Sequence, residues 1–196
     1  MEQNNDPFKI EYYHTKLEQG VILVSEPFSK DSYFKRSVIL LTEYNEKGSI
    51  GFVLNKPVQS PVSEILSDFP EIDADISIGG PVATNTIHFI HTLGDKIQNS
   101  YKVFDNLYWG GNLEQLKLLI NSGFVKKDNV QFFVGYSGWS PKQLEREISE
   151  HYWIVTELDS KKIMTANKDS FWKETLNNLG EKYKIWADAP ENPDMN

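Results

Sequence analysis

The sequence predicts a mixed α+β fold with a largely antiparallel sheet and flanking helices. Short runs rich in β-branched and aromatic residues recur along the 196-residue chain, and helical patterns occur only sporadically between them. A doubly wound parallel sheet would instead need strands and helices in strict alternation. The length suits one domain, and no linker or internal repeat divides the chain.

The first part of the predicted sheet contains a β-hairpin. Residues 21–25 are a short β-branched run, and residues 37–44 (SVILLTEY) are the strongest strand pattern in the chain. The turn residues 45–48 (NEKG) follow, and residues 49–55 return as a strand. Two β-rich runs joined by Asn and Gly are typical of a hairpin.

A short helix and two further strands come next. Ser60 is a preferred N-cap residue and Pro61 suits the first helical position, so we expect a helix over residues 61–67. Residues 75–78 predict a buried strand that runs into a Gly-Gly-Pro turn. Residues 86–92 (TIHFIHT) predict another strand.

Two short strands, at residues 101–104 and 107–109, precede a helix expected over residues 112–121. Asn112 can cap this helix, and its leucines lie on one face. Gly123 would end it.

The segment after residue 130 predicts a strand, a turn and a helix. Residues 130–136 (VQFFVGY) suit the strand and residues 141–150 the helix. Ser140 as N-cap and Gln143 at the third helical position would form a capping box, in which each side chain binds a backbone N–H of the other residue. Trp139, just before the cap, can form a hydrophobic staple with the helix.

The C-terminal part predicts a strand over residues 152–157 and a last helix over residues 169–179, which Gly180 would end. The expected boundaries are a loosely held arm at 1–16, a single domain at 17–186 and an acidic, proline-containing tail at 187–196.

Composition argues against nucleic-acid binding. The net charge is −8, and Arg36 and Arg146 are the only arginines among 20 basic residues. Proteins that bind DNA neutralise phosphates with clustered bases and read guanine with arginine. We therefore expect no direct, sequence-specific contact with nucleic acid.

Composition also excludes thiol chemistry. The chain has no cysteine, so thiol nucleophiles, zinc–thiolate sites and disulfides are absent. The N-terminus, residues 1–7, is polar and acidic, unlike a signal peptide. The longest apolar runs have four residues, whereas a membrane helix needs about 20. We expect a cytoplasmic protein without a membrane segment.

An ordered set of short motifs runs through the chain. It comprises Gly20–Ser25 with Pro27, Phe34-x-Arg36-Ser37 with residues 38–41, Gly48, Gly51, Asn55 with Pro57, Gly79-Gly80-Pro81-Val82, Gly135-Tyr136-Ser137-Gly138-Trp139, Gln143-Leu144-Glu145-x-Glu147-Ile148, Trp153, Trp172 and Leu179-Gly180. In this order the motifs resemble the YqgE/AlgH family of bacterial proteins, over about residues 17–180.

The resemblance implies a single α+β domain with a partly open, barrel-like sheet in a cytosolic bacterial protein. Family members are often labelled transcriptional regulators, yet the family has no agreed biochemical activity. Many members carry Gly before Gln-Leu-Glu, whereas Lys142 stands there in this chain.

Ser137 is a candidate nucleophile, because Gly135-Tyr136-Ser137 begins the Gly-x-Ser-x-Gly pattern of hydrolases. The last position of that pattern is Trp139 here, and no carboxylate is placed in sequence to orient a histidine such as His151. The alternative is that the Ser137 hydroxyl binds local backbone.

Other candidate residues have two interpretations each. Gly79 and Gly80 could form an anion-binding nest or a tight turn. Arg36 could clamp a carboxylate or phosphate or make a structural ion pair. Asn55 could face a ligand or bind nearby backbone. His88 and His91 lie three apart on a strand and would point to opposite faces, so no metal pair is expected.

The favoured function is a non-enzymatic binding or regulatory protein in the cytosol, acting on transcription only indirectly. Its partner would be an unknown small molecule or protein, and no cofactor or metal is expected. The candidate ligand-binding residues are Arg36, Asn55, Gly79, Gly80, Tyr136, Ser137 and Trp139. The alternative is an enzyme that acts on a phosphorylated or acyl small molecule through Ser137 or Arg36.

Overall fold

The computed structural model describes residues 16–29 and 31–190. The strands are β1 (Ile22–Ser25), β2 (Val38–Asn45), β3 (Gly48–Val53), β4 (Ile76–Ile78), β5 (Val82–His91), β6 (Tyr101–Phe104), β7 (Leu107–Trp109), β8 (Val130–Trp139) and β9 (Trp153–Thr156). The helices are α1 (Val62–Ile65), α2 (Leu113–Asn121), α3 (Gln143–Ser149), α4 (Ser160–Thr165), α5 (Phe171–Asn178) and α6 (Glu181–Ala187), with short 3-10 turns η1 (Gly94–Lys96) and η2 (Lys127–Asn129).

The strands form one open sheet. Its order is β6-β7-β5-β8-β3-β2-β1-β9, and β4 pairs with β8 beside this path. Every pairing between these strands is antiparallel except that of β4 with β8, which is parallel. The expected α+β class with a largely antiparallel sheet is therefore confirmed.

Both faces of the sheet are buried, which explains why the strands read as continuous apolar runs. In β1, Ile22 and Val24 face one core, while Leu23 and the preceding Val21 face another. Phe133 in β8 joins the first core, whereas its neighbour Phe132 joins a third. Successive side chains of a strand point to opposite faces, so each apolar run supplies two cores at once.

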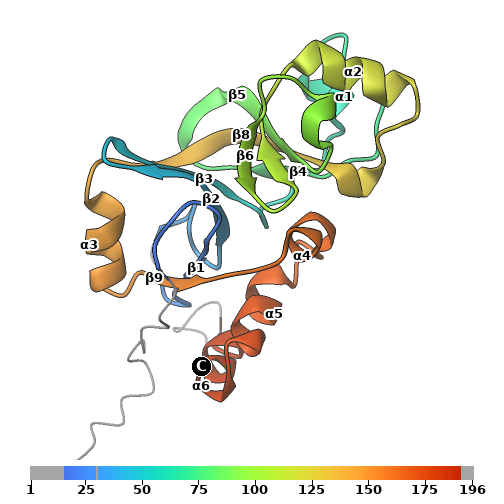
Figure 1. Ribbon diagram of the computed structural model, residues 1–196. Coiled ribbons are helices and arrows are strands. Elements are labelled where there is room, and N and C mark those ends of the chain that lie inside the picture. Colours follow the sequence, from blue (N-terminus) through green and yellow to red (C-terminus); the bar gives the residue numbers. More distant parts are fainter. Residues whose placement is uncertain (1–15, 30, 191–196) are drawn as a thin grey trace, which may run out of the picture.

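The largest core lies inside the curved sheet and is closed by the C-terminal helices. Residues of β1, β2, β3, β8 and β9 meet α4, α5 and α6 there. Figure 1 shows α4 to α6 along the lower side of the sheet. Trp172 of α5 is anchored at this interface, since its Nε1–H donates to the backbone oxygen of Ser25 at 3.0 Å.

The remaining helices cover the outer faces of the sheet. Helices α1 and α2 pack on the half that contains β4, β5 and β8, and α3 packs on the half that contains β1, β2 and β3. Figure 1 shows these two groups at opposite ends of the molecule. No helix in residues 16–29 and 31–190 is long and apolar enough to cross a membrane.

The two ends of the sheet approach each other. Gln19 precedes β1, and its side-chain amide donates to the backbone oxygens of Lys102 and Val103 in β6 at 2.8 and 2.9 Å. This contact links one edge of the sheet to the strand next to the other edge, so the open sheet is drawn partly closed.

The expected strand, turn and capping box around Ser137 are wrong in detail. Strand β8 continues to Trp139, and Gly138 and Ser137 pair with β3 inside the sheet. Helix α3 begins only at Gln143, with Lys142 as its N-cap in the left-handed conformation at φ 63°. Half of the expected box is present, because Gln143 Oε1 accepts the Ser140 backbone N–H at 3.0 Å.

Other element boundaries also differ from the sequence expectations. Helix α1 is shorter than expected and starts after Pro61, without a side-chain cap from Ser60. Helices α4 and α6 were not expected, and Gly180 separates α5 from α6 rather than ending the last helix. Asn112 caps α2 as expected, since its side chain accepts the Gln115 N–H. The expected arm at 1–16 lies outside the described residues except for Lys16, as do residues 191–196 of the expected tail, whereas Ala187 belongs to α6.

Replacing Lys142 by glycine should stabilise the protein. A left-handed conformation costs an L-residue about 1–2 kcal/mol, and glycine avoids most of this cost. Glycine also loses more entropy on folding, by about 0.5–1 kcal/mol. We expect Lys142→Gly to raise the free energy of unfolding by about 0.5–1 kcal/mol, measured by denaturant melts. Lys142→Ala, which keeps the strained backbone, is the control and should lack this gain; equal stability of the two variants would contradict the prediction.

Candidate functional site

Arg36 and Asn55 lie together at the start of β2. The Asn55 side chain is buried, its Nδ2 donates to the Arg36 backbone oxygen at 2.9 Å, and its Oδ1 accepts the Val38 N–H at 2.8 Å. Both ends of this amide therefore hold local backbone. The Arg36 guanidinium lies 5.0 Å from the Trp172 ring centre and donates through Nη2 to the Ala189 backbone oxygen. Arg36 thus connects the sheet to the C-terminal helices.

Gly79, Gly80 and Ser137 form a second group where the chain leaves β4. Ser137 is fully buried, and its hydroxyl donates to the Gly79 backbone oxygen at 2.9 Å. A Cβ built on Gly80, at φ 154°, would lie 2.4 Å from the Ser137 Oγ and from the Tyr136 backbone. Glycine is needed there because two backbones meet without space for a side chain. This arrangement holds Ser137 away from solvent.

Trp139 belongs to an aromatic box on the outer face of the sheet. Its ring lies 6.1 Å from that of Trp153 and 6.4 Å from that of Phe34, measured between centroids. Phe34 also contacts Trp153 edge-on at 5.5 Å. Helix α3 covers the box through Leu144, which is fully buried in the same core. The expected packing of Trp139 against the start of α3 is present, although the cap residue differs.

Glu147 of α3 supplies the polar partner of the aromatic box. Its Oε2 accepts the indole N–H groups of Trp139 at 2.9 Å and Trp153 at 2.8 Å. Its Oε1 accepts the Gln143 amide at 2.9 Å. Buried indole N–H groups need an acceptor, and this one carboxylate serves two of them. A carboxylate offers about four acceptor positions, so one remains open on Oε1.

A hollow lies beside this box, between the segment after β1 and helix α3. We call it the aromatic groove; its volume is about 570 Å³. The lining residues come from the segment after β1 and from α3 and β9: Ser25, Glu26, Phe28, Ser29, Asp31, Phe34, Gln143, Glu147, Tyr152 and Trp153. Ligand sites are concave, of about 300–1,000 Å³, and lined mainly by apolar and aromatic side chains with few polar groups. The aromatic groove fits this description.

The aromatic groove continues into a smaller hollow of about 130 Å³. The two share Glu26, Phe28 and Tyr152, and the smaller one adds His151 and Trp186 among its lining residues. Phe28 and Tyr152, which line both hollows, are 40% and 49% exposed. The joined hollows give an extended surface rather than a single closed pocket.

Glu26 is the least compensated carboxylate of the groove. Burial raises its pKa above the ordinary value, because desolvation penalises the charged form. No hydrogen bond or ion pair to this carboxylate is made by residues in the described ranges. By contrast, Asp31 accepts the Tyr33 backbone N–H at 2.8 Å. The Glu26 carboxylate is therefore partly desolvated, and the described residues leave its oxygen atoms available as hydrogen-bond acceptors.

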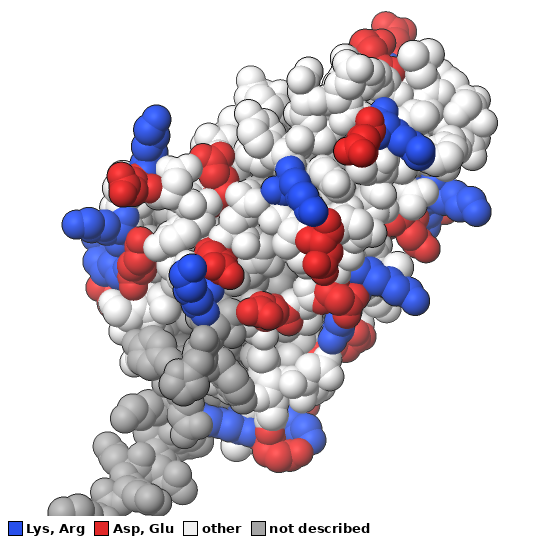
Figure 2. Space-filling view, in the orientation of Figure 1, with Lys and Arg blue, Asp and Glu red and all other residues white. Residues whose placement is uncertain are grey.

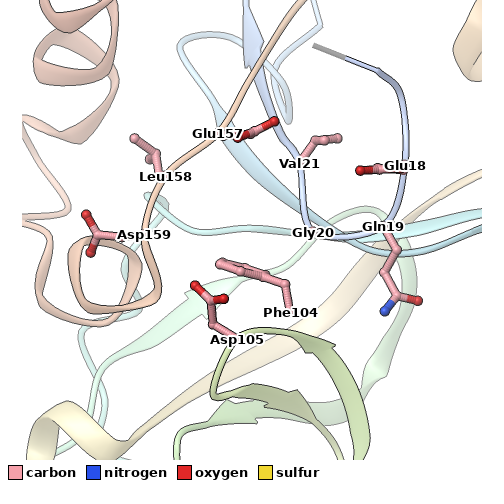
Figure 3. Close-up of a pocket in the computed structure, with 9 residues that line it drawn as sticks. All are labelled: Glu18, Gln19, Gly20, Val21, Phe104, Asp105, Glu157, Leu158 and Asp159. Carbon is pink, nitrogen blue, oxygen red and sulfur yellow. The ribbon is translucent and has the colours of Figure 1, made fainter.

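The described residues also form two other hollows, the hairpin cleft and the seam pocket, which differ from the aromatic groove in size and lining. The hairpin cleft, about 380 Å³, lies between the β2–β3 hairpin and the end of β8, and Tyr136 and Trp139 line it. The seam pocket, about 400 Å³, lies where the two ends of the sheet approach; Figure 3 shows Phe104 and Asp105 facing the Gly20 backbone and the segment 157–159. Asp159 in the seam pocket is engaged as the cap of α4. Neither hollow matches the size or the aromatic lining of the groove.

His88 and His91 are held within the fold and are not grouped with carboxylates as metal ligands. His91 is fully buried, its Nδ1 accepts the Leu93 N–H, and burial lowers its pKa to about 4. His88 faces Phe52 and Tyr136 on the side of the largest core, and desolvation lowers its pKa. Within residues 16–29 and 31–190, no group of three or more His, Asp or Glu side chains is placed to hold a metal ion.

Sequence reasoning missed Glu26, Glu147 and Tyr152. The sequence placed Glu147 only in the first turns of a helix, and nothing local in the sequence connects it to the indoles. The pairing of β1 with β9 brings the segment after Ser25 beside Trp153. Its only sequence signals are the short apolar patterns of two strands far apart in the chain.

Comparisons with known proteins decide the family. A family model described as AlgH-like matches residues 22–184. The chain belongs to the AlgH-like family. A UPF0301 protein of Chlorobaculum parvum is 42% identical to it over 180 residues, covering 92% of this chain and 96% of that protein. A UPF0301 protein of Parabacteroides distasonis is 41% identical over 191 residues, with 96% of each chain covered.

Two solved structures share the fold of this AlgH-like chain. A crystal structure of a Corynebacterium diphtheriae protein aligns with a TM-score of 0.74 at 19% identity, covering 92% of this chain and 95% of that one. The solution structure of the AlgH protein from Pseudomonas aeruginosa aligns with a TM-score of 0.70 at 24% identity, covering 93% and 98%. The resemblance to the YqgE/AlgH family is therefore confirmed.

Removing the Glu147 carboxylate should destabilise this AlgH-like protein strongly. Glu147→Ala leaves the N–H groups of two largely buried indoles without an acceptor. Each unsatisfied buried donor costs about 1–3 kcal/mol, so two of them predict a loss of roughly 2–6 kcal/mol in denaturant melts. The matched control is Glu145→Ala on the same helix, which removes one exposed hydrogen bond to Tyr44. A loss no larger than that of the control would contradict the role assigned to Glu147.

Ser137 should behave as a structural hydroxyl. We expect no labelling by fluorophosphonate probes, because the hydroxyl is buried and donates to the Gly79 oxygen. Ser137→Ala should cost about 0.5–1.5 kcal/mol of stability, the range for one lost hydrogen bond. Covalent labelling that disappears in the folded Ser137→Ala variant would refute this and make the protein a hydrolase.

Proposed function

We propose that this AlgH-like protein is a non-enzymatic binding protein of the bacterial cytoplasm that recognises its partner in the aromatic groove. One observation carries the proposal: exposed aromatic rings and incompletely paired acceptors line the same cavity. A binding surface needs apolar area with a few oriented polar groups. The aromatic box, together with its polar partner Glu147, forms the rigid wall of the groove.

The residues expected from the sequence have a defined place in this proposal. Trp139 supports the groove wall and, with Tyr136, lines the adjoining hairpin cleft, which we propose as a secondary contact surface. Arg36, Asn55, Gly79, Gly80 and Ser137 fix the strand ends around which the surface is built. The burial of Ser137 supports binding rather than acyl transfer.

A regulatory role would pass through the bound partner rather than through DNA. The net charge of −8 disfavours contact with phosphates. On the face shown in Figure 2, acidic and basic side chains are interspersed, without a continuous basic patch. We propose that any effect on transcription is indirect.

The test is a ligand screen read by thermal shift and by mapping of backbone NMR signals. The screen should contain aromatic acids, aromatic amines and short peptides. Ligand at 100 times its dissociation constant stabilises by about 2.7 kcal/mol, and we expect hits to shift signals of residues 25–29 and 143–153. Tyr152→Ala should abolish the stabilisation. Tyr101→Ala is the matched control, since Tyr101 is an exposed tyrosine, 71% accessible, that does not line the groove.

Two results would overturn the proposal. Hits that map only to the seam pocket or the hairpin cleft would move the site elsewhere. Turnover of a hit by the purified protein, lost in a groove variant, would make the protein an enzyme.

A further inference from the structure

We propose that the aromatic groove receives an arginine side chain of an extended segment from a partner protein. This inference rests on the binding function proposed above and names the chemistry that the groove selects. The argument combines the charge of the groove, its rings and its shape.

The charged residues among the described lining of the groove are all acidic. Glu26, Asp31 and Glu147 line it, and Glu150 lies in the adjoining smaller hollow beside His151. Among the described lining residues of the larger cavity there is no lysine, arginine or histidine. A cation is the complement of this lining, because opposite potentials across an interface favour association and exclude anionic partners.

Glu26 and Glu147 are the two carboxylates of the groove that we propose as acceptors for the guanidinium. Glu26 is partly desolvated, and no described residue makes a hydrogen bond or ion pair to its carboxylate, so a bound cation would compensate its charge. Glu147 is held rigidly by three donors and keeps one acceptor position on Oε1. Together they offer acceptor positions at two places in the groove, which suits the several N–H donors of a guanidinium better than a single ammonium.

The rings favour the same ligand. Phe28 and Tyr152 are exposed at the groove, and Phe34 and Trp153 lie within it. A planar guanidinium stacks on aromatic faces and forms cation–π contacts. The chain already uses this contact once, where the Arg36 guanidinium lies 5.0 Å from the Trp172 ring centre.

The shape favours a peptide over a free small molecule. The volume of about 570 Å³ exceeds what one guanidinium needs, and the groove continues past Tyr152 into the second hollow. An extended segment could place its arginine between the carboxylates and lay its neighbouring apolar side chains on Phe28 and Tyr152.

The experiment compares three peptides by calorimetry with the full-length protein. The first is acetyl-Gly-Leu-Arg-Leu-Gly-amide, the second replaces arginine by its uncharged isostere citrulline, and the third replaces it by glutamate. We expect only the arginine peptide to bind, and its binding should shift the NMR signals of residues 25–29 and 143–153. Its affinity should fall as the salt concentration rises from about 0.05 M to about 0.5 M. Acetylarginine amide should bind more weakly than the peptide, whereas equal affinity would overturn the choice of an extended segment.

The variants locate the charge contact. Glu26→Gln should weaken arginine-peptide binding about tenfold or more, as expected when one partner of a charge-assisted hydrogen bond is lost. This variant breaks no hydrogen bond of the described protein, so it should remain folded. Glu64→Gln on α1 is the matched control, because Glu64 is exposed and far from the groove in the fold; it should bind as the unaltered protein does.

The outcomes separate the two levels of the proposal. Equal binding of the citrulline and arginine peptides would overturn arginine recognition but leave groove binding standing. Binding that Glu26→Gln and Glu64→Gln weaken equally would also overturn it. If no peptide binds while other compounds in the screen shift groove signals, the arginine inference fails and the binding function does not.

Discussion

The burial of both faces of one sheet is the constraint on which the rest of the structure depends. Each strand in the middle of the sheet must place apolar side chains on both sides, so helices are needed on the outer faces as well as inside the curve. Strand β8 concentrates this requirement, because it pairs with β3, β4 and β5. The three helical groups are therefore consequences of one sheet, and a change in β8 would reach all of them.

The polar groups of the protein sit where these cores meet the surface. Lys168 is an example on the side of α4: it is almost wholly buried, donates to Gln131 Oε1 at 2.9 Å, and its pKa is lowered to about 8, chiefly by burial. Gln131 in turn donates to the backbone oxygens of Ile163 and Met164. Glu147 of α3 connects its helix to the sheet in a similar way, because its carboxylate accepts the indole N–H groups of Trp139 and Trp153. In both places one polar side chain fixes a helix against the sheet, but only Glu147 borders a large hollow.

Local patterns predicted the elements that local interactions form. The hairpin of β2 and β3 and the capped helix α2 were both expected, since turn residues and a cap act within a few positions. The end of β8 was missed because Gly138 and the helix-start pattern at Ser140 and Pro141 indicated a turn after Tyr136. In the sheet Gly135, at φ 65°, lies where a Cβ would be 2.7 Å from the Val82 oxygen. Glycine there permits close approach of strands within an irregular pairing, a reason that only the tertiary structure reveals.

The candidate site illustrates the same boundary between local and distant information. Trp139 and Gln143 could be identified because they flank a helix start, and Asn55 because it ends a strand. Glu26 and Tyr152 could not, since their meeting depends on the pairing of β1 with β9. Helices α4 and α6 were also missed, because their stability comes from the inner core rather than from strong helical patterns.

The pairing of β1 with β9 has a consequence for how the chain acquires its structure. Ile22 pairs with Thr156, so β1, the first strand in the sequence, cannot complete its pairing until β9 is available. The parallel strands β4 and β8 likewise join distant segments. Such non-local contacts slow folding, typically to milliseconds or longer, because the ordering entropy of the intervening chain is lost before the contacts form. During synthesis on the ribosome, the edge of β1 that pairs with β9 therefore stays unpaired until most of the polypeptide has emerged. We expect chaperones to bind the nascent chain at this stage.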